Sequence, residues 1–433
     1  MIRSATRTLL NASYLVLNYH KYLRSQYFSP AQLQEIQRAK LEEIIRVAVT
    51  KVPFYKSLAR EIDFNNFTIQ ELNKFPRVSK DIIRAEPDQF IRDDVNRKHL
   101  QWKTTSGSSG KPFATPKHYF SDAVEGIMGY RAWSMGKNKI YQYRSPSLAL
   151  RSYSPKPGDP IYKYDSLRRY WYLSPYHINE AHLQDYVRII RESKATVLRG
   201  YPSSLYIFTL LLRKHNIRFP QIETLVCSSE TLLPQYRKAI EAYWGISLLD
   251  WYGQNERTVI VQQCWAGNYH NNDEYGFIEL AADGQIIATS LWNNIMPLIR
   301  YETRDKAIPY SGDPYGCPCG RKLSIPFASI QGRSDDIIVK DDGTMIPSIN
   351  FYTAMEPFQR LDQFKLIQQA DQSINLLLTS GERLDAEYVE RIRAAIAQRT
   401  GALPITIEQV PDLPRSLSTE KVKAFESHFV GRS

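Results

Sequence analysis

Short apolar runs alternate with helical repeats between residue 100 and about residue 300. The run "ATVLRG" at 195–200 leads into the helical pattern "PSSLYIFTLLLRKH", and "IETLVCSSE" at 222–230 leads into "LLPQYRKAIEAYWG". "ISLLDWYGQNE" follows at 246–256. Strands that alternate with helices predict an α/β fold with a mostly parallel sheet, whose ligands bind at the carboxyl ends of the strands.

The N-terminal region carries two helical patterns. "LLNASYLVLNYHKYLR" at 9–24 has an apolar run that is broken by Asn11. We expect an ordinary amphipathic helix there, with a targeting segment or a membrane-surface helix as the alternatives. Ser29 and Gln32 have the spacing of a capping box, which predicts a second helix over 29–50.

The pattern changes after "FASIQGRSDD" at 327–336. "FKLIQQ", "INLLLTS", "AEYVERIRAAIAQRTG" and "ITIEQV" predict a β-β-α-β unit, in which Gly401 ends the helix. We therefore expect two domains, a large domain with parallel-rich sheets over residues 1–332 and a small α+β lid domain over residues 333–433.

Composition narrows the class of protein. The 433 residues are 43% hydrophobic with a net charge of +11, which favours a folded chain with a large core. No basic tract or aromatic-interleaved basic patch favours a nucleic-acid partner. No apolar stretch approaches the roughly 18 residues of a membrane span. Four cysteines do not suggest a secreted disulfide scaffold, so we expect a reducing, cytoplasmic setting. We expect a monomer or a homodimer.

The stretch "TTSGSSGKPFATP" at 104–116 contains the densest cluster of Gly, Ser and Thr. Glycine amides, hydroxyls and Lys111 suit a phosphate cradle, whereas the same composition also suits a flexible linker. Two residues separate Gly107 from Gly110, and Pro112 follows the lysine, so this is not a Walker-A loop. Taken alone, the stretch leaves cradle and linker equally open.

Five separated motifs occur in a fixed order: "TTSGSSGKP" (104–112), "CSSE" (227–230), "WYGQNE" (251–256), "PLIRYETRD" (297–305) and "QGRSDDIIV" (331–339). In this order they resemble the motifs of the adenylate-forming superfamily of acyl-CoA synthetases and peptide-synthetase adenylation domains. Within it, the chain is similar to the phenylacetate–CoA ligase branch and its relatives from capsular polysaccharide biosynthesis. "VPFYK" at 52–56 and "FPRVSKDIIR" at 75–84 also resemble that branch.

The resemblance implies an AMP-forming ligase. Such an enzyme uses ATP to convert a small carboxylic acid to an acyl-adenylate and then passes the acyl group on. The acceptor is a thiol, of coenzyme A or a carrier protein, or an amine. A catalytically silent scaffold with the same fold is the alternative, because the C-terminal "LPRSLSTEKVKAF" has Glu420 where the family commonly has glycine.

The resemblance also implies a role for each motif residue. The ATP phosphates would be bound by Thr105, Ser106, Gly107, Ser108, Ser109, Gly110 and Lys111. Adenine and ribose would be contacted by Ser228, Ser229, Glu230, Tyr252, Asp305 and Arg333. Glu256 would bind catalytic Mg²⁺, for which a carboxylate is a suitable hard ligand, and Asp335 would be the hinge between the domains.

Three of these assignments have open alternatives. Tyr252 could pack in the core instead of stacking on adenine, and Glu256 could be a solvated loop residue. Lys421 is our choice for the catalytic lysine, with Lys423 as the alternative. Arg304 stands where relatives commonly carry glycine, so the ribose loop is expected to differ.

Three cysteines and a histidine form a separate candidate site. Cys264 and His270 lie close in sequence, and Cys317 and Cys319 belong to "YGCPCGRK". Three thiolates and one imidazole make a closed tetrahedral set, which is typical of structural zinc. The alternative is a set of reduced cysteines with a hydrogen-bonded histidine. Cys227 lies in an apolar strand and is expected in the core.

Overall fold

The computed structural model describes residues 2–429 apart from 106–112, 137–140, 142–143, 152, 154, 156–157, 176, 334–336, 340–344, 348–350, 352–353, 356, 359, 402 and 415–423. No helix in these described ranges is long and apolar enough to cross a membrane.

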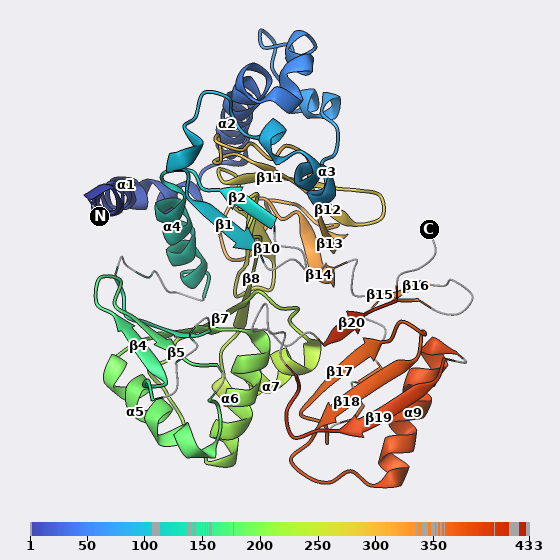
Figure 1. Cartoon of the computed structure of the whole chain (residues 1–433). Coiled ribbons are helices and arrows are strands. Elements are labelled where there is room, and N and C mark those ends of the chain that lie inside the picture. The colour runs from blue at the N-terminus through green and yellow to red at the C-terminus, as the bar shows by residue number, and fades with distance from the viewer. Residues whose placement is uncertain are drawn as a thin grey trace.

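An eight-stranded sheet forms the centre of the molecule, with the strand order β10-β9-β8-β7-β6-β3-β5-β4 (Figure 1). Its strands are β3 (Ser147–Leu150), β4 (Tyr162–Asp165), β5 (Tyr170–Leu173), β6 (Val197–Gly200), β7 (Thr224–Ser228), β8 (Leu248–Gly253), β9 (Ile260–Gln263) and β10 (Tyr269–Asn271). Neighbours from β8 through β5 are parallel, whereas β4, β9 and β10 pair antiparallel at the two edges. The predicted α/β class and mostly parallel sheet are therefore confirmed.

Helices cover both faces of this sheet. Successive strand residues point to opposite faces, so Leu198 packs with the helices α5 (Leu183–Ser193) and α6 (Pro202–Lys214), while Val197 packs with α4 (Ser121–Trp133). The helix α7 (Pro234–Trp244) joins the same cluster as α5 and α6. It ends at Gly245, whose φ of 70° is the left-handed conformation that glycine adopts without steric cost.

A second, antiparallel sheet has the order β11-β12-β13-β14. Its strands are β11 (Gly276–Leu280), β12 (Gln285–Ser290), β13 (Tyr301–Pro309) and β14 (Phe327–Arg333). The hairpin of β1 (Trp102–Thr105) and β2 (Phe113–Pro116) is a separate two-stranded sheet. The candidate loop 106–112 connects these two strands and lies outside the described residues.

The N-terminal region is helical. It contains α1 (Ile2–Ser25), α2 (Pro30–Lys51), η1 (Pro53–Arg60), η2 (Ile69–Lys74), α3 (Lys80–Ala85), η3 (Pro87–Phe90) and η4 (Arg97–His99). The Ser29 side chain accepts from the Gln32 amide, and the Gln32 side chain accepts from the Ser29 amide, so the predicted capping box is confirmed. The predicted N-terminal helix is present as α1.

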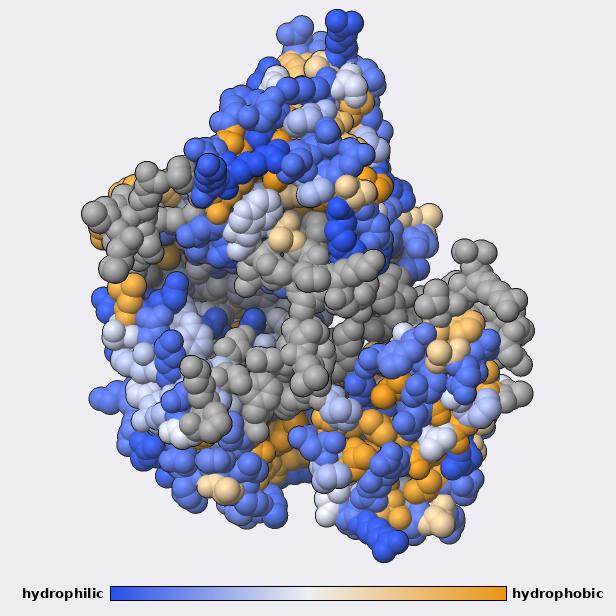
Figure 2. Space-filling model, viewed as in Figure 1, coloured by the Kyte–Doolittle hydropathy of each residue, from blue (hydrophilic) through white to orange (hydrophobic). Residues whose placement is uncertain are grey.

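The C-terminal region forms its own sheet, with the order β19-β18-β17-β20. Its elements are β17 (Gln363–Gln368), β18 (Ile374–Thr379), α9 (Ala386–Thr400), β19 (Ile405–Gln409) and β20 (Phe425–Ser427), preceded by the hairpin β15 (Ile337–Val339) and β16 (Met345–Pro347). The predicted β-β-α-β unit is present, and Gly401 ends its helix. Figure 2 shows apolar residues among polar ones on the surface over this sheet. The boundary between 332 and 333 stays a prediction.

Candidate active site

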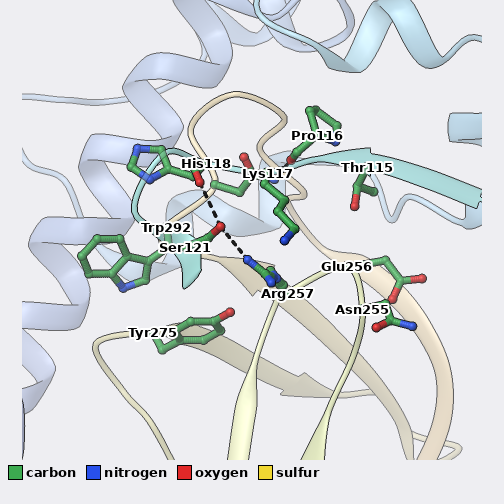
Figure 3. A pocket seen from close by; sticks show the side chains of 11 residues that line it. Thr115, Pro116, Lys117, His118, Ser121, Asn255, Glu256, Arg257, Tyr275 and Trp292 are labelled. Carbon is green, nitrogen blue, oxygen red and sulfur yellow. Dashed lines mark hydrogen bonds between the residues drawn. The ribbon is translucent and has the colours of Figure 1, made fainter. Parts of the chain in front are cut away.

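A pocket lies between the base of the β1–β2 hairpin and the segment that follows β8 (Figure 3). Thr115 and Lys117 line it from the hairpin side, and Asn255 and Glu256 line it from the β8 side. The Asn293 side chain donates to the Pro116 carbonyl at 2.9 Å and fixes the base of the hairpin. The base of the hairpin that carries the Gly- and Ser-rich loop therefore lies beside Glu256.

Glu256 is buried, with 4% of its surface exposed. Its Oε1 atom accepts hydrogen bonds from the Lys80 ammonium at 2.7 Å and from the Tyr301 hydroxyl at 3.2 Å. A buried carboxylate is retained where cations or donors compensate the loss of water. The alternative of a solvated loop glutamate is therefore wrong, and this carboxylate is aimed at a cationic partner.

Arg257 fixes the backbone next to Glu256. Its guanidinium contacts Asp122 at 3.0 Å and Glu125 at 2.7 Å, both in the first turns of α4. Its φ of 60° lies in the left-handed region, which is uncommon outside glycine. The turn after β8 is thus held against α4, and Glu256 has a defined position.

Lys80 is a site residue that our sequence reasoning did not single out. Val78 pairs in parallel with Tyr301 of β13, so the segment that precedes α3 runs along the strand that carries Asp305. The only sequence signal was the motif "FPRVSKDIIR", which supported the family resemblance without a role for its lysine. The pairing with β13 carries this distant residue to Glu256.

Arg304, which stands where relatives commonly carry glycine, has a glycine-like backbone conformation. Its φ is 65°, a left-handed conformation that favours glycine, and its guanidinium pairs with Asp81 of α3. The ion pair lies one residue away from Lys80 and joins the same two segments. The arginine therefore keeps the glycine-like turn and adds a tie between α3 and β13.

Asp305 and Tyr252 form the second part of the site. The Tyr252 hydroxyl donates to Asp305 Oδ2 at 2.8 Å and accepts from the Gln254 amide at 2.6 Å. Burial, followed by the Asp305 charge, raises the pKa of Tyr252 well above its usual range, so the phenol stays protonated. The Tyr252 ring also packs edge-on against Phe327. Tyr252 therefore packs in the core, and its stacking on adenine stays a prediction.

Ser228, Ser229 and Glu230 lie at the carboxyl end of β7. Ser228 is the register partner of Trp251, the residue before Tyr252, and its hydroxyl accepts from Arg151 at 2.5 Å. Ser229 has a φ of 75°, which turns the chain out of the strand. The Glu230 carboxylate accepts from the Ser203 amide at 3.1 Å. These residues border the Tyr252 region, and their contact with adenine stays a prediction.

The structure brings four of the five motifs together around Tyr252, Asp305 and Glu256, the fourth of them through the backbone of Arg333. Arg333 is the register partner of Asp305, so its backbone joins them, although its side chain is not among those described. Thr105 is described only as the last backbone position of β1. Several predicted residues lie outside the described ones: Ser106, Gly107, Ser108, Ser109, Gly110, Lys111, Asp335, Lys421 and the alternative Lys423.

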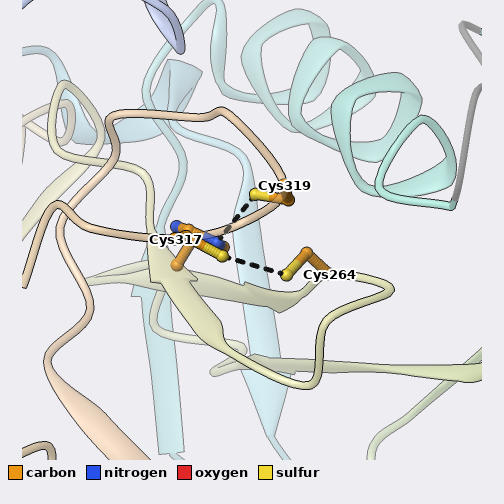
Figure 4. A group of neighbouring side chains, drawn as sticks. Cys264, Cys317 and Cys319 are labelled. Atoms are coloured by element: carbon orange, nitrogen blue, oxygen red, sulfur yellow. Dashed lines mark hydrogen bonds between the residues drawn. The ribbon is translucent and has the colours of Figure 1, made fainter. Parts of the chain in front are cut away.

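The predicted metal cluster is assembled (Figure 4). The ligand atoms of Cys264, His270, Cys317 and Cys319 all lie within 4.8 Å of one another. Cys264 Sγ is 3.6 Å from Cys317 Sγ, and Cys319 Sγ is 3.4 Å from His270 Nε2. Zinc bonds of about 2.3 Å to sulfur and about 2.0 Å to nitrogen place tetrahedral ligand atoms about 3.5–3.8 Å apart. The four residues therefore fit a closed zinc site.

The surroundings orient the ligands. His270 Nδ1 lies 3.0 Å from the Leu323 carbonyl, which accepts a hydrogen bond from Nδ1–H and leaves Nε2 directed at the sulfurs. The Asn268 amide donates to Cys317 Sγ at 3.2 Å. Hydrogen bonding with Cys264 and with His270 holds the pKa of Cys319 well below its usual range. The cluster joins the β9–β10 hairpin to the loop before β14. Cys227 is fully buried in the core, as predicted.

Comparison with known proteins supports the family resemblance. No family model matches the chain. Protein CapK of Staphylococcus aureus is 21% identical over 342 residues, which cover 75% of this chain and 73% of CapK. A phenylacetate-coenzyme A ligase of Aromatoleum evansii is 22% identical over 373 residues, with 74% of this chain and 77% of the ligase covered.

The fold has a solved counterpart. The crystal structure of 2-hydroxyisobutyryl-CoA ligase in the postadenylation state, in complex with R3-HIB-AMP, matches with a TM-score of 0.69. The match covers 94% of this chain and 92% of that one at 15% identity. By sequence and by fold, the chain is similar to the phenylacetate–CoA ligase and CapK branch of the adenylate-forming superfamily, which confirms the predicted resemblance.

Proposed function

We propose that the protein activates a carboxylic acid with ATP to give an acyl-adenylate and pyrophosphate, and then transfers the acyl group to the thiol of coenzyme A. A carrier-protein thiol and an amine are the alternative acceptors. The observation that carries the proposal is that Glu256 lies beside the base of the Gly- and Ser-rich hairpin and contacts Tyr301 of β13, while Asp305 of the same strand contacts Tyr252 at the carboxyl end of β8.

The reaction requires two anionic groups to meet. A carboxylate oxygen forms a bond to the α-phosphorus of ATP, the bond to the β-phosphate oxygen breaks, and pyrophosphate leaves. The thiol then attacks the acyl carbon and releases AMP. Catalysis of the first step consists mainly of placing the groups and offsetting their charge.

The residues of this chain divide that work. We assign the phosphates to the loop from Thr105 to Lys111 and the ribose hydroxyls to Asp305, whose two carboxylate oxygens can accept two hydrogen bonds. Glu256 would hold Mg²⁺, which shields the charge of the phosphates when it is bound. Lys80 lies 2.7 Å from Glu256 and adds a cation at the same place.

The zinc cluster has a structural role in this proposal. A set of four protein ligands leaves no open coordination position, so the metal would stabilise the fold and take no part in the reaction. Cys264, Cys317 and Cys319 are free thiols in the described structure. We propose a reducing, cytoplasmic setting, which keeps such closely spaced thiols available for zinc.

Glu256→Gln and Lys111→Ala should each weaken ATP use by more than about tenfold, or about 1.4 kcal/mol. The first change removes the charge that binds the metal, and the second removes the cation of the loop. The measurement is the ATP dependence of acid-driven pyrophosphate release. Glu302→Gln is a matched control on β13 beside Tyr301, since its side chain points to the opposite face of the strand. Unchanged ATP dependence in both test variants would remove the assignment of the loop and of Glu256.

The carboxylic acid substrate can be identified by a direct screen. Aryl and small aliphatic carboxylic acids would be tested for pyrophosphate release with ATP and Mg²⁺, and then for a thioester with coenzyme A. Pyrophosphate release with no thioester, but with an amide when amines are supplied, would support the amine-ligase alternative. Pyrophosphate release without a thioester of coenzyme A and without an amide would support a carrier-protein thiol as the acceptor.

A further inference from the structure

The helix α1 presents apolar side chains to solvent. Leu9, Leu10, Val16 and Leu17 are 69%, 53%, 56% and 80% exposed. Leu9 and Val16 are seven residues apart, as are Leu10 and Leu17, so the four side chains share one side of the helix. A solvent-facing helix side normally carries polar residues. We call this set the α1 apolar face.

The opposite side of α1 is fixed to the protein. Tyr19 and Tyr22 are buried against α4, and the Asn11 side chain bonds the Tyr119 carbonyl and the Ala123 amide at 2.8 and 3.0 Å. Figure 1 shows α1 at the edge of the molecule, with its N-terminal end directed away from the central sheet. The helix is therefore docked, and its apolar face remains outward after docking.

The charged residues of α1 itself have one sign. The first 34 residues contain Arg3, Arg7, Lys21 and Arg24 and no aspartate or glutamate. Lys21 and Arg24 are exposed and follow Leu17 within the next two turns. Exposed leucines beside lysine and arginine are the features of helices that lie in the surface of an anionic membrane.

We propose that the α1 apolar face binds the surface of an anionic lipid bilayer, with Leu10 and Leu17 inserted among the acyl chains and Lys21 and Arg24 at the phosphate groups. A second copy of the chain is a poorer occupant. Pairing of two α1 faces would bring basic residues from both copies together, and α1 contributes no carboxylate to offset them. The proposal is independent of the adenylation reaction.

Vesicle sedimentation of the full chain tests this proposal. Wild-type protein should bind vesicles that contain phosphatidylglycerol and bind pure phosphatidylcholine vesicles much less. The double change Leu10→Gln with Leu17→Gln should reduce binding by at least about tenfold, because two leucines lose their insertion energy. Lys21→Gln with Arg24→Gln should reduce binding only to the anionic vesicles, and added salt should do the same in the wild type.

Leu167→Gln is the matched control, since Leu167 is 60% exposed in the turn between β4 and β5, away from α1. Its vesicle binding should equal that of the wild type. Thermal unfolding should be unchanged in every variant, which shows that the fold is intact. Equal binding by the Leu10/Leu17 variant and the wild type, or no binding by either, would overturn the proposal. So would a dimer in solution that this variant converts to monomers.

Discussion

Replacement of Lys421 by alanine is expected to slow acid-dependent adenylate formation by about a hundredfold or more, on the order of 2.7 kcal/mol. In relatives, as the family resemblance implies, the small domain brings a lysine to the reacting carboxylate and α-phosphate. Its charge offsets the negative charge that builds up in the transition state. Transfer from a supplied acyl-adenylate to the acceptor should be nearly unchanged, because the small domain then presents another face. Lys421 lies outside the described residues, so this role is a proposal from sequence.

Lys423→Ala is the matched control for this prediction. It removes the same charge two residues away, in the same undescribed segment. If Lys423→Ala slows adenylate formation and Lys421→Ala does not, a lysine still takes part in this step, and Lys421 is the wrong assignment. If neither variant slows an active wild type, the lysine mechanism of the family does not operate in this chain.

Loss of the proposed zinc is expected to lower the stability of the fold and to leave the reaction rate nearly unchanged. Purified protein should contain about one zinc per chain, and a metal present at a thousandfold above its dissociation constant stabilises the fold by about 4 kcal/mol. Cys317→Ser should lose the metal and lower the unfolding midpoint accordingly. The rate per folded molecule should stay near that of the wild type, because the four-ligand set has no open position.

Cys227→Ser separates loss of the metal from loss of a buried thiol. Cys227 is fully buried beside Asp250 and is not part of the cluster, so this variant should keep its zinc even where it loses stability. Metal analysis that finds no zinc in stable, active wild-type protein would contradict the zinc proposal.

The elements that depend on local sequence were predictable. Ser29 and Gln32 specify a capping box within four residues, and Gly245 and Gly401 end their helices through their own backbone freedom. The β7–α7 unit likewise follows from a short apolar run and a helical repeat. These signals lie within one turn or one strand, so no tertiary contact is needed to find them.

Features that depend on pairing between distant segments were not predictable. Lys80 reaches Glu256 only because Val78 pairs with Tyr301, more than two hundred residues away in the sequence. The strand β20 has only three residues and is defined by its parallel pairing with β17. In contrast, the grouping of Cys264, His270, Cys317 and Cys319 was predictable from their residue types, although they are far apart in the sequence, and their binding of zinc stays a proposal.

Activation of the acid as an adenylate can be followed by the fate of one oxygen atom. The most direct test uses an acid from the screen, labelled with ¹⁸O in its carboxylate, in a complete reaction with ATP and the acceptor. If an acyl-adenylate forms, the bridging oxygen comes from the acid and leaves with AMP, so the AMP should carry one ¹⁸O atom. Unlabelled AMP, label in orthophosphate with formation of ADP, or no acid-dependent turnover with any acid would contradict activation of the acid as an adenylate.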